Sequence, residues 1–195
     1  MKGLKKNIVL VGGGGHCVSV IDIIENGNEY NILGILDSCS KENNLLGYKI
    51  LGDDNLIPDL VHENTYFLVT VGQIKDHLKR KNIAKNLSSY NAKFATVISP
   101  LAYVSKNASV GEGTVIMNNA VVNAKSSIGR HCIVNTMSNV EHGVSIEDFC
   151  HISTCAVVNG DSVIGSGSFI GSNATISNGT LVKEYSVISA GKFIK

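Results

Sequence analysis

Several residue types are scarce in this sequence, and each scarcity excludes a class of protein. The 195 residues include no Trp, 2 Pro and 6% aromatic residues, too few for the stacking surfaces that bind single-stranded nucleic acid. The formal net charge is +1, so no electrostatic attraction to nucleic acid or to an anionic membrane is expected. No apolar run approaches the ~20 residues that a membrane span requires.

The number and spacing of the cysteines exclude two further kinds of structure. The five Cys form an odd set without CxxC spacing, which fits neither a disulfide framework nor a zinc knuckle. The hydrophobic content of 44% is ample for a folded chain. We therefore expect a cytoplasmic, reduced, globular protein with no nucleic-acid partner and no membrane span.

The second half of the chain carries a repeat of six residues. Every sixth position from Ile98 to Ile194 is Ile or Val, and the position four residues later is small at almost every repeat, with Val144 as an exception. An even period preserves the alternation of a β-strand, whereas an α-helix would rotate the apolar stripe away. Three short strands then make one coil of 18 residues, and the segment is predicted to be a parallel β-helix of about five and a half coils.

The repeat also predicts details of the coil. One large and one small residue should point inward on each strand, and Cys132 and Cys150 should stack in adjacent coils, as buried small hydrophobes rather than a redox pair. Residues tolerant of positive φ are expected at the corners directly after the aliphatic position. These residues are Gly111, Gly129, Gly165, Gly171, Asn123, Asn135 and Asn159.

The first 97 residues have a different rhythm. A buried strand at 7–11 is followed by the glycine turn Gly12–Gly15, a helix pattern at 17–24 and a strand at 32–36 that ends in Asp37. This order is typical of a Rossmann-like βαβ unit with a mainly parallel sheet, which we assign to residues 1–95, with the β-helix at 96–195. A further strand is expected at 66–71, and a basic helix from Ile74 to about Tyr90.

The glycine turn is a candidate anion site, because it places backbone N–H groups at a helix N-terminus. The third glycine of the dinucleotide fingerprint is replaced by Cys17, which favours part of a mononucleotide over NAD, with a purely structural turn as the alternative. Asp37 is expected to accept hydrogen bonds from a ribose or base, or else to be a turn residue. We interpret the basic cluster of residues 75–81 as a solvated helix face.

Among six histidines, His142 has the strongest functional signal. It lies two residues after an inward valine, and a corner would let its ring escape outward, where an imidazole is a plausible general base. One coil later the stacked residue is Gly160, whose N–H is suited to stabilising an oxyanion. Structural roles remain open for His142, His151 and His131, and His62 and His77 carry no signal. The spacing of the histidines does not match a zinc site of the gamma-carbonic-anhydrase type, so no metal is expected.

The sequence resembles the hexapeptide-repeat sugar acetyltransferases of the NeuD-like, bacillosamine- and perosamine-pathway type. The resemblance rests on motifs spread over nearly the whole chain. They are VGGGGH at 11–16, Gly34–Asp37, Val71–Gly72, SVGEGTVIMNNAVV at 109–122, VNTMSNVEH at 134–142 and DFCHIS at 148–153.

The resemblance implies a left-handed β-helix, a homotrimer, and acetyl-CoA bound between neighbouring helices. It implies that His142 is the general base and that Gly160 meets the thioester carbonyl. By the same match Asn135, His151 and Ala156 line the acetyl-CoA site. The sugar or nucleotide-sugar acceptor is expected at Gly12, Gly14, His16, Asp37 and Gly72.

Three departures from the family pattern stand out. The carboxylate that usually follows the base histidine is replaced by Gly143, and Glu141 points the other way if strand parity holds. Ser153–Ala156 replaces the usual Ser-Pro-Gly-Ala, and the sequence ends at Lys195, before the usual Pro-containing tail.

Together with the resemblance, these residues predict an acetyl-CoA-dependent N-acetyltransferase acting on an amino sugar, expected to be nucleotide-linked, in surface-glycan synthesis. Direct attack on the thioester requires no covalent intermediate on Cys155 or Ser153. The alternatives are O-acetylation of sialic acid or a related sugar, and a non-catalytic trimeric binding or scaffold protein.

Overall fold

The computed structural model describes residues 5–74 and 76–195 and divides the chain into two compact units. The first comprises Met1–Gly72 with Lys79–Ala95, and the second Gln73–Leu78 with Thr96–Lys195. The segment Gln73–Leu78, expected in the first domain, thus belongs with the repeats. Within the described residues, no helix has the length and apolar character needed to cross a membrane.

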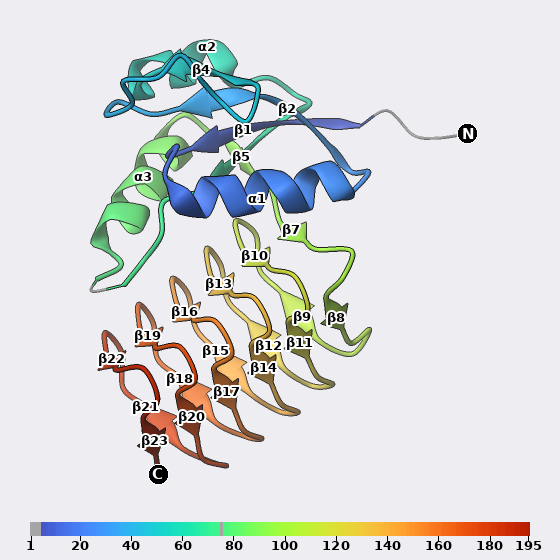
Figure 1. Cartoon of the computed structure of the whole chain (residues 1–195), viewed down its shortest axis with the longest axis vertical. Helices are drawn as coiled ribbons and strands as arrows, with labels where there is room; N and C mark the ends of the chain where they lie inside the picture. Colours follow the sequence, from blue (N-terminus) through green and yellow to red (C-terminus); the bar gives the residue numbers. More distant parts are fainter. Residues whose placement is uncertain (1–4, 75) are drawn as a thin grey trace. The chain divides into compact units, whose positions relative to one another are not determined.

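The first unit is a six-stranded sheet with helices, built as the βαβ pattern predicts (Figure 1). The sheet order is β3-β4-β2-β1-β5-β6, and all pairs are parallel except β3 with β4. The strands are β1 (Lys6–Val11), β2 (Tyr30–Leu36), β3 (Asn44–Leu45), β4 (Tyr48–Gly52), β5 (Thr65–Val69) and β6 (Lys93–Phe94). The helices are α1 (Gly15–Asn26), α2 (Ile57–Leu60) and α3 (Leu78–Ser89), with a 3₁₀ turn at Asp54–Leu56.

Cys17 lies in the first turns of α1 and is fully buried. Burial raises the pKa of its thiol to about 11; a hydrogen bond with Thr70 opposes this shift, and the charge of Asp37 adds to it. The side chain is therefore an inert part of the core.

Arg80 on α3 corrects the prediction that the basic cluster is a solvated face. Its side chain is 1% exposed, and Nη1 donates to the carbonyl oxygens of Val69 (2.9 Å) and Val71 (2.6 Å). These carbonyls lie at the end of β5, where a buried guanidinium can satisfy acceptors that have left the sheet. Lys79 and Lys81 are exposed, as expected, and Lys75 lies outside the described residues.

The second unit is the predicted parallel β-helix (Figure 1). Strands pair with the strand 18 residues later, as in Val115 with Ile133 and Ile116 with Val134. Three sheets result: β22-β19-β16-β13-β10-β7, β23-β20-β17-β14-β11-β8 and β21-β18-β15-β12-β9. The two-residue strands are Val97–Ile98, Tyr103–Val104, Ser109–Val110, Val115–Ile116, Val121–Val122, Ser127–Ile128, Ile133–Val134, Asn139–Val140, Ser145–Ile146, His151–Ile152, Val157–Val158, Val163–Ile164, Phe169–Ile170, Thr175–Ile176, Leu181–Val182, Val187–Ile188 and Phe193–Ile194, labelled β7 to β23 in order.

Both predicted inward registers form the core. The large aliphatics from Ile116 to Val182 are at most 4% exposed, and the small positions between them are buried with them, except Thr180, which is half-buried. Cys132 and Cys150 are free thiols in this core, and each donates to a backbone carbonyl, of Glu147 (3.1 Å) and Gly165 (3.2 Å) respectively. They are buried small residues, as the repeat predicts.

The corners differ from the prediction. None of the seven residues expected to have positive φ has it; the left-handed conformation occurs two residues later, at the third position after the aliphatic. These positions are Gly113, Asn119, Lys125, His131, Met137, Gly143, Phe149, Cys155, Asp161, Gly167, Asn173, Gly179, Tyr185 and Gly191. The glycines directly after the aliphatic are needed for close approach instead: a Cβ on Gly129 would lie 2.6 Å from the backbone carbon of Glu147 in the next coil.

Gln73 and His77 lie against the β-helix, and the basic helix begins only at Leu78. Gln73 Nε2 donates to the carbonyl of Phe149 (2.9 Å), and the ring of His77 stacks on Tyr185 at 4.9 Å. Gly167 makes room for this ring, since a Cβ there would lie 2.7 Å from its Nδ1. These contacts with a distant part of the chain override the local helical pattern, and His77 is buried although its sequence surroundings are polar.

A pair of glycine variants tests the two corner positions. We expect Gly129→Ala to lower the free energy of unfolding by about 1–3 kcal/mol, because its Cβ collides with backbone that cannot move aside. Gly179 has φ +66° and open space around it, so Gly179→Ala costs only about 1 kcal/mol of left-handed strain. Denaturant unfolding measures both; an equal or larger loss for Gly179→Ala contradicts the assignment.

The thiol of Cys17 provides a second test. With a pKa of about 11 against an ordinary 9.0, and no exposed surface, Cys17 is expected to resist alkylation at pH 8.5, while the exposed Cys39 reacts. Mass spectrometry after iodoacetamide treatment measures this, with denatured protein as the control in which both are labelled. Equal labelling rates in the folded protein would contradict the burial of Cys17.

Candidate functional site

The β-helix places His142 directly over Gly160. His142 lies in the turn after β14 and its side chain is 64% exposed, so the ring does escape outward at a corner. A Cβ built on Gly160 would lie 2.7 Å from Cε1 and 2.9 Å from Nε2 of His142. The ring can occupy this place only because residue 160 has no side chain.

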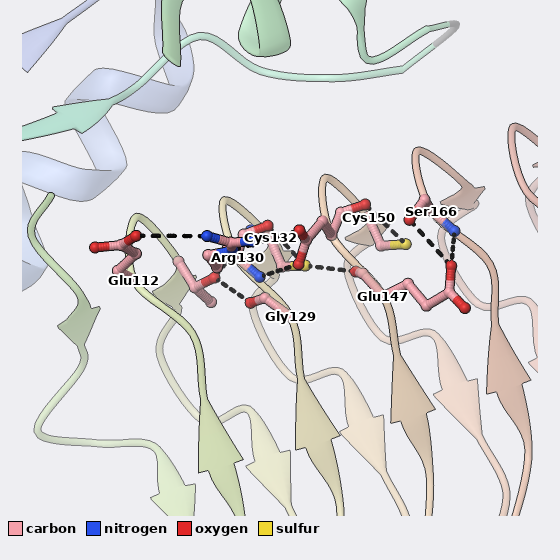
Figure 2. Close-up of polar contacts among 9 residues, drawn as sticks. Glu112, Gly129, Arg130, Cys132, Glu147, Cys150 and Ser166 are labelled. Atoms are coloured by element: carbon pink, nitrogen blue, oxygen red, sulfur yellow. Dashed lines mark hydrogen bonds and ion pairs between the residues drawn. The ribbon is translucent and has the colours of Figure 1, made fainter. Parts of the chain in front are cut away.

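The backbone N–H of Gly160 is suited to binding an anionic oxygen. Throughout the described β-helix, the backbone N–H two residues after each inward aliphatic residue takes no part in the backbone hydrogen bonds between coils. Carboxylates accept from two such amides: Glu147 accepts from Ser166 (2.9 Å; Figure 2), and Asp148 accepts from Arg130 (2.7 Å). Among the described residues, no acceptor is paired with the equivalent N–H of Gly160.

The two nitrogens of the His142 ring have different surroundings. Nδ1 is 4.0 Å from Oδ1 of Asp161, and Nε2 has no hydrogen-bond partner among the described residues. Glu141 points elsewhere, as parity predicts, and accepts from Asn139 (2.8 Å) and Asn123 (3.1 Å). An exposed imidazole beside an unpaired N–H can accept a proton at Nε2 while the amide binds a developing negative charge.

Asn135 and His151 form a second polar pair. His151 Nδ1 donates to the carbonyl of Gln73 (2.6 Å), and Nε2 accepts from Nδ2 of Asn135 (3.0 Å). Because both ring nitrogens are hydrogen-bonded, His151 is suited to fixing the position of Asn135 rather than to acting as a base. Ala156 lies elsewhere: it is fully buried in the core, with its amide bound to Ser153 and its carbonyl to Asn139.

The glycine turn of the first unit lies at the carboxyl ends of β1, β2 and β5. Gly12 has φ +106° and crowds against Val71, so no larger residue fits there. Gly14 is the N-cap of α1 and is exposed, which leaves this helix N-terminus open to an anion. Gly72 lies beside His16, since a Cβ on it would be 3.8 Å from the His16 Cβ.

Asp37 joins the glycine turn to the next loop. Its Oδ2 accepts from Gly13 N (2.6 Å) and its Oδ1 from Cys39 N (2.8 Å). This is the turn role that the sequence left open, and each oxygen retains a lone pair that can accept from a ribose hydroxyl. The structure therefore brings Gly12, Gly14, His16, Asp37 and Gly72 to one edge of the sheet.

Sequence reasoning missed Asp161. The signal was available, because residue 161 is one coil after Gly143, and β14 and β17 pair with this offset. Among the described residues, no group of three or more His, Cys, Asp or Glu side chains could hold a metal ion.

Comparison with known proteins agrees with this architecture. The model of the PglD N-terminal domain family matches residues 7–87. The acetyltransferase domain of PglB from Neisseria gonorrhoeae superposes with a TM-score of 0.91 and 30% identity, covering 98% of this chain and 92% of that chain. A mutant perosamine N-acetyltransferase from Caulobacter crescentus, solved with CoA and GDP-perosamine, has a TM-score of 0.90 and 26% identity over 97% of this chain and 88% of that one.

A curated relative gives the same family from sequence. UDP-N-acetylbacillosamine N-acetyltransferase of Bacillus subtilis is 34% identical over 119 residues, which are 57% of this chain. The match spans about half of that relative's length (51%). The resemblance read from the motifs is confirmed, and so is the left-handed β-helix it implied. The chain belongs to the PglD- and PglB-type family of sugar acetyltransferases, which combine a Rossmann-like unit with a hexapeptide-repeat β-helix.

Proposed function

We propose that the protein transfers an acetyl group from acetyl-CoA to the amine of a nucleotide-linked amino sugar, in the synthesis of a surface glycan. The observation that carries the proposal is the exposed imidazole of His142 lying over Gly160, whose N–H is unpaired among the described residues. The relatives add the substrate class, because their names specify N-acetyltransferases of UDP-N-acetylbacillosamine and perosamine.

The residues present fit acetyl-CoA at this corner. The His142 ring occupies the space that a Cβ on Gly160 would take, and beside this ring the backbone of Gly160 offers one N–H donor to an oxygen. Bound acetyl-CoA supplies an acetyl group activated as a thioester. The N–H of Gly160 donates to the oxygen that gains negative charge during transfer. Asn135 and His151 are assigned to the acetyl-CoA site by the family match.

His142 provides the proton acceptor. The attacking amine must lose a proton as it forms its new bond, and Nε2 of the neutral imidazole accepts it. Cys155 and Ser153 have no nucleophilic role in this direct transfer.

The first unit would hold the acceptor. A nucleotide phosphate fits the exposed N-terminus of α1 at Gly14, where N–H groups and the helix dipole favour an anion. Asp37 accepts from a ribose or base. We also propose that the protein is a homotrimer with acetyl-CoA between neighbouring β-helices, and that it is cytoplasmic.

A thiol-release assay tests the function. Purified protein is incubated with acetyl-CoA and a panel of UDP- and GDP-linked 4-amino sugars, and free thiol is measured. Turnover with at least one amine is expected, with acetylation at nitrogen confirmed by mass spectrometry. Turnover only with hydroxyl acceptors such as sialic acid would establish O-acetylation instead. No turnover and no CoA binding would support a scaffold protein.

His142→Ala tests the base. We expect kcat to fall by about 10²–10⁴-fold with little change in KM for acetyl-CoA, because the ring removes a proton and does not hold the coenzyme. His62→Ala is the matched control, since His62 is exposed in the first unit, and it should retain full activity. Turnover that survives His142→Ala would refute the mechanism.

Gly160→Ala tests the placement of the His142 ring over residue 160. The added methyl group must displace the His142 ring from its place, and a shift of about 1 Å in a catalytic group can cost about 100-fold in rate. We therefore expect a loss of that order in kcat, with thermal stability nearly unchanged because the ring is exposed and can move. Gly179→Ala is the control; equal kcat for both variants would contradict the role of residue 160.

A further inference from the structure

A carboxylate from the neighbouring coil faces the His142 ring. Asp161 lies at the left-handed position of its turn (φ +59°), and its N–H donates to the carbonyl of His142 (3.0 Å). Its Oδ1 is 4.0 Å from Nδ1 of the same residue. Backbone and side chain of Asp161 thus both contact His142.

Gly143 makes room for this carboxylate. Residues 143 and 161 occupy the same place in successive coils, and a Cβ on Gly143 would collide with Oδ1 of Asp161. The oxygen therefore fills the volume that a side chain at 143 would need. Glu141, the other nearby acid, is held by Asn123 and Asn139. Among the described residues, the Asp161 carboxylate has no partner besides His142.

We propose that Asp161 is the positioning residue of His142, supplying from the next coil the carboxylate that Gly143 lacks. Accepting from Nδ1–H, it selects the tautomer in which Nε2 is unprotonated and directed toward the substrate. It also balances the charge of the ring after Nε2 has gained a proton. This inference rests on the proposed function, in which Nε2 is the proton acceptor.

The geometry sets the size of the effect. At 4.0 Å the contact is in ion-pair range but longer than a hydrogen bond of about 2.7–3.2 Å, so a small side-chain rotation closes it. Both side chains are mainly exposed, at 64% and 75%, and water screens their attraction. We therefore expect Asp161 to contribute about two- to fivefold in rate, well below the contribution of His142.

Relocating the carboxylate tests the proposal. Asp161→Gly removes the acid and keeps a residue suited to positive φ, so the fold should be retained. We expect kcat to fall about two- to fivefold with both KM values unchanged. Adding Gly143→Glu to this variant returns a carboxylate to the same column without the collision, and should restore most of the lost kcat. Glu184→Ala, which removes an exposed acid elsewhere on the β-helix, should leave kcat unchanged.

Two measurements separate positioning from structure. In a His142→Ala background, Asp161→Gly should have no further effect on the residual rate. The ¹⁵N shifts of the His142 ring should report a proton on Nδ1 in the wild-type protein and a mixture of tautomers in Asp161→Gly. Unchanged kcat or unchanged ring shifts in Asp161→Gly would overturn the proposal. The ring shifts remain decisive even for a protein without turnover, so this failure is distinct from failure of the proposed function.

Discussion

The hydrogen-bonded register between coils is the constraint on which the second unit depends. Each strand pairs in parallel with the strand 18 residues later, as Asn139 does with Val157. Any side chain therefore lies beside the residue one coil away, and its surroundings follow from two positions in the sequence. The ring of His131 stacks on Phe149 at 4.8 Å for this reason, and His142 lies over Gly160 for the same reason.

Glycine residues create space for individual aromatic rings within this regular stack of coils. A side chain at every position would fill each column, whereas one glycine leaves a gap next to its neighbours. Gly113 admits the ring of His131, Gly160 admits that of His142, and Gly167 admits that of His77. Two of these gaps hold buried packing groups and one holds an exposed imidazole, so the same device serves stability and the candidate site.

The sequence predicted the features that depend on side-chain periodicity. The period of six predicted the coil, both inward registers and the neighbouring positions of His142 and Gly160. It could not predict backbone dihedrals, because the third corner position tolerates Phe149 and Tyr185 in a conformation that usually favours glycine or asparagine. Stacking of these rings on His131 and His77 offsets the local cost. Gln73 and His77 were predicted wrongly because contacts with Phe149 and Tyr185, distant in sequence, decide their positions. Arg80 was predicted wrongly because its acceptors, the carbonyls of Val69 and Val71, lie where the regular pattern of the strand ends.

The stacking of residues 18 apart into columns also explains how a missing site residue can be replaced. Residue 143 has no side chain, and residue 161 brings a carboxylate into the space this leaves. In a helix or a loop, such a shift of 18 residues would move the group far away, but in a β-helix it moves the group by one coil. Comparing position 143 alone with the family pattern therefore shows only that the carboxylate is missing. A comparison of columns shows a carboxylate beside the same histidine, so Gly143 does not by itself argue for a protein without catalysis.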